Sequence, residues 1–199
     1  MADTKPHNQS DTETRFRLFL ASPVDDGLAT PLLESLMASQ DDLPPLKPTP
    51  RENLHLTLAF LGDHSSASVT ENLIPRINDA LSQATPGRIH FRQVAGFPST
   101  KEPRYLALEG YGSPSALALR EQLMQALADL LPPRGKGDGN WRPHVTLARL
   151  REASPGGIEG TPWQVDLPLR RIVLYRSQRG LHGSLYTALH QWDLTESGE

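Results

Sequence analysis

The chain has 199 residues, no cysteine and a formal net charge of −3 at neutral pH. This length suits one globular unit or two small lobes and is enough to bury a core. The absence of cysteine excludes disulfides, thiolate zinc sites and a cysteine nucleophile. The slightly acidic balance excludes a global basic field that would draw the chain to nucleic acid, so local arginines would have to hold an RNA substrate.

The two ends of the sequence are polar and frame one predicted domain. We expect residues 1–14 to form a disordered tail, residues 15–194 a single domain of two intertwined lobes, and residues 195–199 a loose C-terminus. The tail lacks the apolar stretch of a signal peptide, and no run of about 18 apolar residues occurs. The sequence therefore predicts a cytoplasmic protein without membrane contact. No coiled-coil seam is visible, so we expect a monomer.

The first half of the domain predicts strands that alternate with helices. The proposed boundaries follow from apolar runs, from leucines at helical spacing and from turn residues. Pro75 falls inside the second helix and is expected to kink or split it. The predicted elements are a strand over 16–20, a helix over 25–40, a proline-rich loop over 43–50, a strand over 54–61 and a helix over 66–83.

The second half repeats this layout and ends in a hairpin. Its helix begins with Ser113 as N-cap and Pro114 at the first helical position. A glycine-rich segment over 134–140 carries Arg134 and Lys136, and its role is open. The predicted elements are strands over 89–94 and 105–108, a helix over 113–131, a strand over 143–150, a loop over 154–162, and strands over 169–175 and 184–193.

One five-residue pattern occurs twice, as His55-Leu-Thr-Leu-Ala and His144-Val-Thr-Leu-Ala. Residues i and i+2 of a strand point to the same face, so each copy presents an imidazole together with the hydroxyl of Thr57 or Thr146. Packing alone does not require the same polar pair twice. The repeat predicts an α+β fold that is bilobal and pseudo-twofold. In it, two antiparallel sheets meet at the motif strands to form a central cleft, with helices on the outside.

Two histidines on one substrate can divide acid–base work. The unperturbed imidazole pKa of about 6.5 lets one ring take a proton from a nucleophile while the other protonates a leaving oxygen. This division suits in-line displacement at phosphorus. The threonine hydroxyls can donate to non-bridging phosphate oxygens, and Arg149 can stabilise their charge. Arg149 lies at an odd offset from His144, so it reaches the same face only through a strand end or a β-bulge.

Other kinds of site fit the sequence less well. A catalytic zinc usually needs three protein ligands, and neither motif carries a carboxylate. The patterns H-E-x-x-H, G-x-S-x-G and the phosphate-binding P-loop are all absent. We therefore expect no metal and no cofactor. A binding module that holds a nucleotide or an RNA end without turnover remains the alternative from another class.

The two motif blocks resemble the 2H phosphoesterase superfamily, and within it the LigT-like bacterial RNA 2′,3′-cyclic phosphodiesterases. The resemblance is carried by residues 52–62 and 142–149, flanks included, and more loosely by the opening strand over 17–21 and the closing residues 175–177, Tyr186 and 192–194. It covers about residues 15–194.

The resemblance implies metal-independent opening of a 2′,3′-cyclic phosphate on RNA or a nucleotide, giving a 2′-phosphate. Reversible 2′-5′ joining of tRNA halves is also implied. His55 and His144 would be the acid–base pair, Thr57 and Thr146 would hold phosphate oxygens, and Arg149 would be a further phosphate contact. The order of acid and base is open, with a preference for His144 as base toward water and His55 as acid toward the 3′ oxygen. The alternative substrates are 2′-5′ linked oligonucleotides and ADP-ribose cyclic phosphate.

Overall fold

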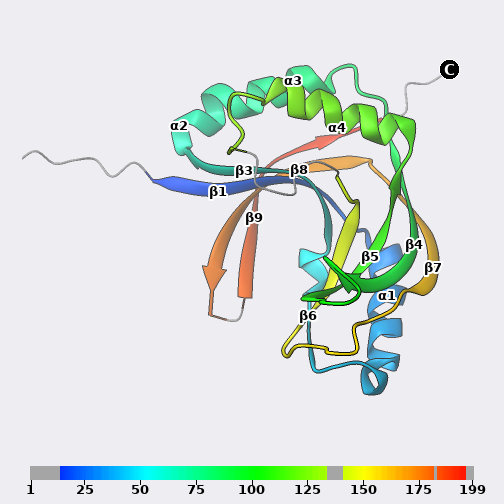
Figure 1. Cartoon of the computed structure of the whole chain (residues 1–199). Helices are drawn as coiled ribbons and strands as arrows, with labels where there is room; N and C mark the ends of the chain where they lie inside the picture. Colours follow the sequence, from blue (N-terminus) through cyan, green and yellow to red (C-terminus); the bar gives the residue numbers. More distant parts are fainter. Residues whose placement is uncertain (1–13, 134–140, 182, 196–199) are drawn as a thin grey trace, which may run out of the picture.

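The computed structural model describes residues 14–133, 141–181 and 183–195. In these ranges the chain forms nine β-strands of one antiparallel sheet, with helices packed against it (Figure 1). The tail predicted over residues 1–14, apart from Thr14, and the glycine-rich segment 134–140 lie outside the described residues.

The elements follow each other closely along the chain. The strands are β1 (Arg15–Pro23), β2 (Leu46–Pro48), β3 (His55–Ser65), β4 (Arg88–Phe97), β5 (Tyr105–Gly112), β6 (His144–Leu150), β7 (Thr161–Pro168), β8 (Arg171–Gly180) and β9 (Gly183–Asp193). The helical segments are α1 (Asp26–Ala38), η1 (Gln40–Asp42), η2 (Arg51–Asn53), α2 (Ser66–Ser68), η3 (Val69–Leu73), α3 (Ile74–Leu81) and α4 (Pro114–Ala126).

The prediction of two separate sheets is wrong, because the motif strands pair with each other and join both halves into one sheet. Its strand order is β7-β4-β5-β6-β3-β1-β8-β9, with β2 paired to β6. The link between β3 and β6 is a single antiparallel residue pair, Leu56 with Val145. This single pair connects the two halves of the sheet, and beyond it β3 and β6 are not paired with each other.

Three strands extend outward from each motif strand along this order. From β3 it continues through β1 and β8 to β9, and from β6 through β5 and β4 to β7. Helix α1 connects β1 to β3 and contacts β6, whereas α4 connects β5 to β6 and contacts β3. Each connecting helix therefore packs partly on the other half, and α3 and α4 lie side by side above β1, β3 and β8 (Figure 1).

The helices bury one apolar side each against the sheet. As predicted, Ser113 caps α4, with its hydroxyl accepting from the backbone N–H of Ala116 and with Pro114 in the first turn. The buried apolar residues of the connecting helices are Leu28, Ala29, Leu32 and Leu36 of α1 and Ala116, Leu119 and Leu123 of α4. Among the helices that the described ranges contain, none combines the length and apolar character of a membrane span.

Three segments differ in kind from the predicted elements, and the helix predicted over 113–131 ends at Ala126. The run over 66–81 is helical throughout, but it passes through the π-helical η3 immediately before Pro75, whose ring nitrogen has no hydrogen to donate. The proline-rich loop contains the short strand β2, which pairs with β6. Strand β7 was not predicted, because Pro162 and Pro168 flank its alternating apolar residues. Its place at the edge of the sheet tolerates both prolines.

Replacing Leu56, which is fully buried at the junction of the halves, tests the single sheet. We expect Leu56→Ala to lower the free energy of unfolding by about 2–5 kcal/mol, because it leaves a cavity in the core. Leu117→Ala, on the exposed side of α4, is the control and should change it by less than about 0.5 kcal/mol. Urea unfolding followed by circular dichroism measures both. Equal effects would contradict a buried junction.

Candidate active site

The structure brings both motif copies to one face at the centre of the sheet. Strands β3 and β6 begin at His55 and His144, and the residue that follows each histidine forms the pair joining the two halves. The next residue along each strand is Thr57 or Thr146. Both histidines and both threonines are half-buried. The apolar motif residues on the opposite side of the strands are buried, namely Leu56, Leu58, Val145 and Leu147.

Both imidazoles are held in the same way by the backbone. Nδ1 of His55 lies 2.6 Å from the carbonyl oxygen of Asn53, and Nδ1 of His144 lies 2.8 Å from that of Arg142. A carbonyl oxygen only accepts, so each Nδ1 carries a hydrogen and donates it. This fixes the tautomer and leaves Nε2 of each ring as the atom available for proton transfer.

Arg149 shares the face of His144 because β6 contains a bulge. Strand β5 pairs Ala107 with Thr146 and then Leu106 with Ala148, which leaves Leu147 as an extra residue in β6. The side chains after the bulge change face, so Arg149 is exposed on the histidine side. The odd offset seen in the sequence is resolved by the bulge that this orientation requires. Directly across from Arg149 lie Tyr105 on β5 and Lys47 on β2.

In the described part of the chain, the two threonine hydroxyls have no hydrogen-bond partner and the Arg149 guanidinium has no carboxylate partner. Within residues 14–133, 141–181 and 183–195, Thr57 and Thr146 make no side-chain hydrogen bond, and Arg149 makes no ion pair. They are therefore donors that face the same region as the two Nε2 atoms without competing partners of their own.

Aromatic side chains surround His55. The ring of Phe19 lies 5.1 Å from the imidazole, and Tyr186 meets it edge-on at 5.3 Å. Tyr175 stacks on Phe19 at 5.2 Å and completes this wall. Sequence reasoning did not assign a role to these residues. They come from β1, β8 and β9, so only the pairing of distant strands places them beside His55.

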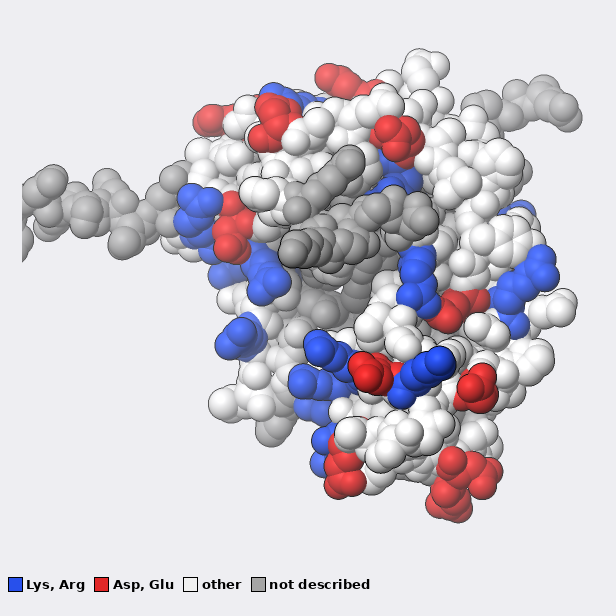
Figure 2. Space-filling view, in the orientation of Figure 1, with Lys and Arg blue, Asp and Glu red and all other residues white. Residues whose placement is uncertain are grey.

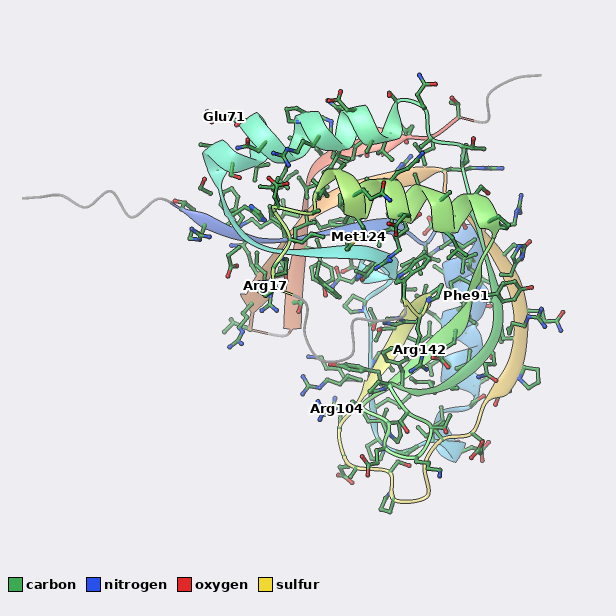
Figure 3. All side chains as sticks on the ribbon, turned by 45° about the horizontal axis from the view of Figure 1, so that its top comes forward. Arg17, Glu71, Phe91, Arg104, Met124 and Arg142 are labelled. Atoms are coloured by element: carbon green, nitrogen blue, oxygen red, sulfur yellow. The ribbon has the colours of Figure 1, made fainter. Side chains whose placement is uncertain are left out.

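His144 stacks on one aromatic ring and lies beside one ion pair. It stacks on Phe97 at 4.1 Å, and the Arg142 guanidinium lies 4.8 Å from the same ring. Arg142 donates to Glu109 at 2.5 Å, and Glu109 is the residue directly across the strands from His144. Arg142 is labelled in Figure 3, on the half of the sheet opposite to that of Arg17. Phe97 and Glu109 were also missed by sequence reasoning, because no motif marks them.

Burial lowers the pKa of both histidines below the usual value of 6.5. For His55, burial lowers the pKa, the hydrogen bond to Asn53 raises it, and the charge of His144 lowers it. For His144, burial lowers the pKa, the hydrogen bond to Arg142 and the charge of Glu109 raise it, and the charge of Arg142 lowers it. Both rings are therefore mainly neutral at neutral pH in the absence of a bound anion.

The hairpin of β8 and β9 is tied to the start of β3. The side-chain amide of Asn53 donates to the carbonyl oxygen of Ser184 at 3.1 Å, while the backbone carbonyl of Asn53 holds His55. Farther along β3, Trp141 donates to the carbonyl of Thr57 and Arg120 to that of Leu58. The first motif is thus held by the backbone of β9 through Asn53 and by the side chains of Trp141 and Arg120.

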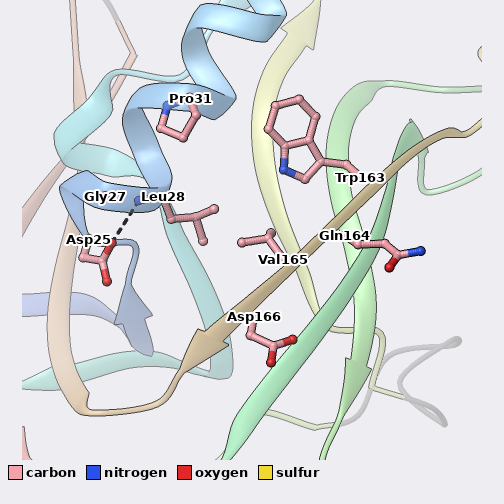
Figure 4. Close-up of a pocket in the computed structure, with 8 residues that line it drawn as sticks. All are labelled: Asp25, Gly27, Leu28, Pro31, Trp163, Gln164, Val165 and Asp166. Carbon is pink, nitrogen blue, oxygen red and sulfur yellow. Dashed lines mark hydrogen bonds between the residues drawn. The ribbon is translucent and has the colours of Figure 1, made fainter.

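A separate pocket lies between α1 and β7 (Figure 4). Its lining includes Asp25, Leu28 and Trp163 but none of the motif side chains. No cluster of three potential metal ligands occurs among the described residues. Figure 2 shows acidic and basic side chains interspersed over the visible face rather than one basic field. The paired histidines are therefore the candidate site with the clearest chemistry.

Comparison with known proteins agrees with this fold. Residues 37–180 match the 2′-5′ RNA ligase superfamily, and the chain belongs to that family. An RNA 2′,3′-cyclic phosphodiesterase of Thermus thermophilus is 30% identical over 154 residues, which are 74% of this chain and 75% of that protein. The crystal structure of TT0787 of Thermus thermophilus has a TM-score of 0.78 at 26% identity, covering 92% of this chain and all of the other.

A nucleotide complex is known for one structural relative. The crystal structure of Escherichia coli LigT complexed with NADP+ has a TM-score of 0.65 at 25% identity, covering 92% of this chain and all of that one. The resemblance stated from the two motif blocks is confirmed by these matches.

Proton NMR titration tests the electrostatics of the two rings. We expect both His55 and His144 to titrate below pH 6.5, because burial disfavours the imidazolium. Removing the Glu109 charge should lower the pKa of His144 further, since that carboxylate favours the protonated ring. Glu109→Gln is the test and Glu34→Gln, an exposed change on α1, is the control for net charge. A His144 midpoint that rises in Glu109→Gln would contradict this arrangement.

Proposed function

We propose that this protein is an RNA 2′,3′-cyclic phosphodiesterase that opens a terminal 2′,3′-cyclic phosphate to a 2′-phosphate without a metal or cofactor. The observation that carries the proposal is the pair of imidazoles on neighbouring strands. Each is held at Nδ1 by a backbone carbonyl and has Nε2 available on the shared face. The relatives named RNA 2′,3′-cyclic phosphodiesterase support the choice of substrate.

Two available Nε2 atoms suit the two proton transfers that this reaction requires. One Nε2 removes a proton from water as its oxygen attacks phosphorus. The other Nε2 donates a proton to the 3′ oxygen as the P–O3′ bond breaks, leaving the phosphate on the 2′ oxygen. The reaction needs one ring neutral and one charged. Both free rings are mainly neutral, so the charge of a phosphate bound between them favours protonation of the acid.

The phosphate-binding groups lie beside the histidines. Thr57 and Thr146 are each two residues along the strand from a histidine, so their hydroxyls donate to the non-bridging oxygens from the two sides. Arg149, turned to this face by the bulge in β6, adds a positive charge on the His144 side. These donors stabilise the charge that develops on the phosphoryl oxygens during displacement.

Among the two possible orders we propose His144 as the base toward water and His55 as the acid toward the 3′ oxygen. Glu109 and Arg142 act on the pKa of His144 in opposite directions. Because they form one ion pair, their influences largely offset each other. The charges near His144 therefore do not distinguish the acid from the base, whereas a substrate with a changed leaving group does.

Turnover of defined cyclic phosphates tests the activity itself. With EDTA present, the protein should convert adenosine 2′,3′-cyclic phosphate, and a short RNA ending in that group, to 2′-phosphate products resolved by chromatography. His55→Ala and His144→Ala should each lower kcat by at least about 100-fold, because each removes one proton transfer. His64→Ala, just beyond the first motif block, is the matched control and should retain the rate.

The outcomes separate the remaining alternatives. Exclusive 3′-phosphate product would contradict the proposed chemistry, and full activity in either histidine variant would contradict the acid–base pair. Tight binding of the cyclic nucleotide without product would favour a binding module. Turnover of 2′-5′ linked oligonucleotides or ADP-ribose cyclic phosphate in its place would change the substrate class. Because the family is that of 2′-5′ RNA ligases, paired tRNA halves should also be assayed for joining.

A substrate with sulfur at the bridging 3′ position tests the order of acid and base. A thiolate leaves without protonation, so the loss in the variant that lacks the acid should largely disappear. We expect His55→Ala to regain at least about tenfold relative to the oxygen substrate, whereas His144→Ala should regain little. Rescue of His144→Ala instead would reverse the two roles and leave the rest of the mechanism intact.

A further inference from the structure

The residue two positions before each motif histidine contacts the imidazole through its backbone and a distant segment through its side chain. Before His55 this residue is Asn53. Its carbonyl oxygen accepts from Nδ1 of His55 at 2.6 Å, and its side-chain amide donates to the carbonyl oxygen of Ser184 at 3.1 Å. One half-buried residue at the end of η2 therefore joins the imidazole to the hairpin of β8 and β9, 131 residues away in the chain.

Arg142 makes contacts of the same two kinds in the second copy. Its carbonyl oxygen accepts from Nδ1 of His144 at 2.8 Å, and its guanidinium donates to the carbonyl oxygen of Pro98 at 2.7 Å. Arg142 also forms an ion pair with Glu109, which the neutral Asn53 cannot do. The repeat thus extends beyond the motif to two positions whose side chains differ but whose contacts agree.

Each of the two held segments carries an aromatic ring that packs against the histidine. Tyr186 follows the held carbonyl of β9 by two residues, and its ring meets the imidazole of His55 edge-on at 5.3 Å. Phe97 directly precedes Pro98 and stacks on His144 at 4.1 Å. Each imidazole therefore lies between a carbonyl oxygen at Nδ1 and an aromatic ring, and one preceding residue contacts both supports.

The two held segments do not correspond to each other in the sheet. Strand β9 lies three strands from β3 in the strand order, whereas β4, which ends at Phe97, lies two strands from β6. The hairpin of β8 and β9 projects from the rest of the sheet (Figure 1). Duplication of one segment therefore does not account for the shared contacts. What both copies have in common is the need for an imidazole of fixed orientation.

We propose that Asn53 and Arg142 are positioning residues, each of which orients its histidine by holding the distant segment whose aromatic ring packs on that histidine. The inference rests on the proposed function and adds to it two residues that act through the imidazoles. Proton transfer needs Nε2 within hydrogen-bond reach of a reacting oxygen, so an imidazole that can turn loses rate even when its pKa is suitable.

Asn53 gives the cleaner test, because its side chain is neutral. Asn53→Ala removes the amide and keeps the backbone carbonyl. We expect kcat for adenosine 2′,3′-cyclic phosphate to fall about tenfold and KM to change less than about twofold, since a misplaced proton-transfer group slows the chemistry more than it weakens binding. Gln191→Ala, which removes an exposed amide on β9, is the matched control and should retain kcat.

Nitrogen-15 NMR of the imidazoles distinguishes positioning from a purely structural role and needs no turnover. At a pH well above the pKa of both rings, the unmodified protein should carry the hydrogen of each on Nδ1. In Asn53→Ala this fraction should fall for His55 and stay unchanged for His144, because the hydrogen bond that sets the tautomer is then less well held. Arg142→Met should show the reverse. A lower free energy of unfolding with kcat and both tautomers unchanged would overturn the proposal.

A double substitution tests the route through the aromatic ring. If Asn53 acts through the segment that carries Tyr186, then Asn53→Ala and Tyr186→Leu remove the same support. The loss of kcat in the double variant should be close to that of the larger single loss. Losses that multiply would overturn the proposal, as would an unchanged kcat in Asn53→Ala. Absence of turnover in the unmodified protein would instead be a failure of the proposed function, and the NMR comparison would still decide the positioning role.

Discussion

Leu56 of β3 and Val145 of β6 pair across the middle of the sheet, and each lies between the histidine and the threonine of its motif. Both residues are fully buried. This one backbone contact brings the two motifs together, because strand residues on either side of it must point to the opposite face. Three further strands extend the sheet on each side, and this one local pairing positions all four polar side chains.

The same burial that stabilises the junction also sets the chemistry of the site. The apolar face of each motif strand fills the core, and the histidine face is lined by Phe19 and Phe97. Removing water from around the imidazoles lowers the pKa of both rings. Backbone carbonyls two residues before each histidine direct Nε2 outward. A site assembled in this way favours the neutral form of both imidazoles.

Each motif strand has a bulge at the same position, and the residue that the bulge turns outward differs between the two copies. A regular strand would turn the fifth residue after each histidine into the core, where an arginine would be costly. The bulge in β6 turns Arg149 outward, and a bulge in β3, where β1 pairs Ala21 with Thr57 and Leu20 with Ala59, turns the exposed Phe60 outward. The chemical asymmetry of the site thus depends on backbone irregularities, while its histidine and threonine donors keep the pseudo-twofold symmetry.

The sequence by itself determined the motif residues, their shared face, most of the helices and strands, the capped start of α4 and the family. These features depend on local spacing, which period-two strands and helix caps express directly. Only the tertiary structure decided that the motif strands join one sheet, and that β2 and β7 belong to it. It likewise decided that Phe19, Tyr175, Tyr186, Phe97 and Glu109 surround the histidines. Those contacts depend on pairing between strands far apart in the chain, and strand partners follow from the assembled core rather than from any short stretch of sequence.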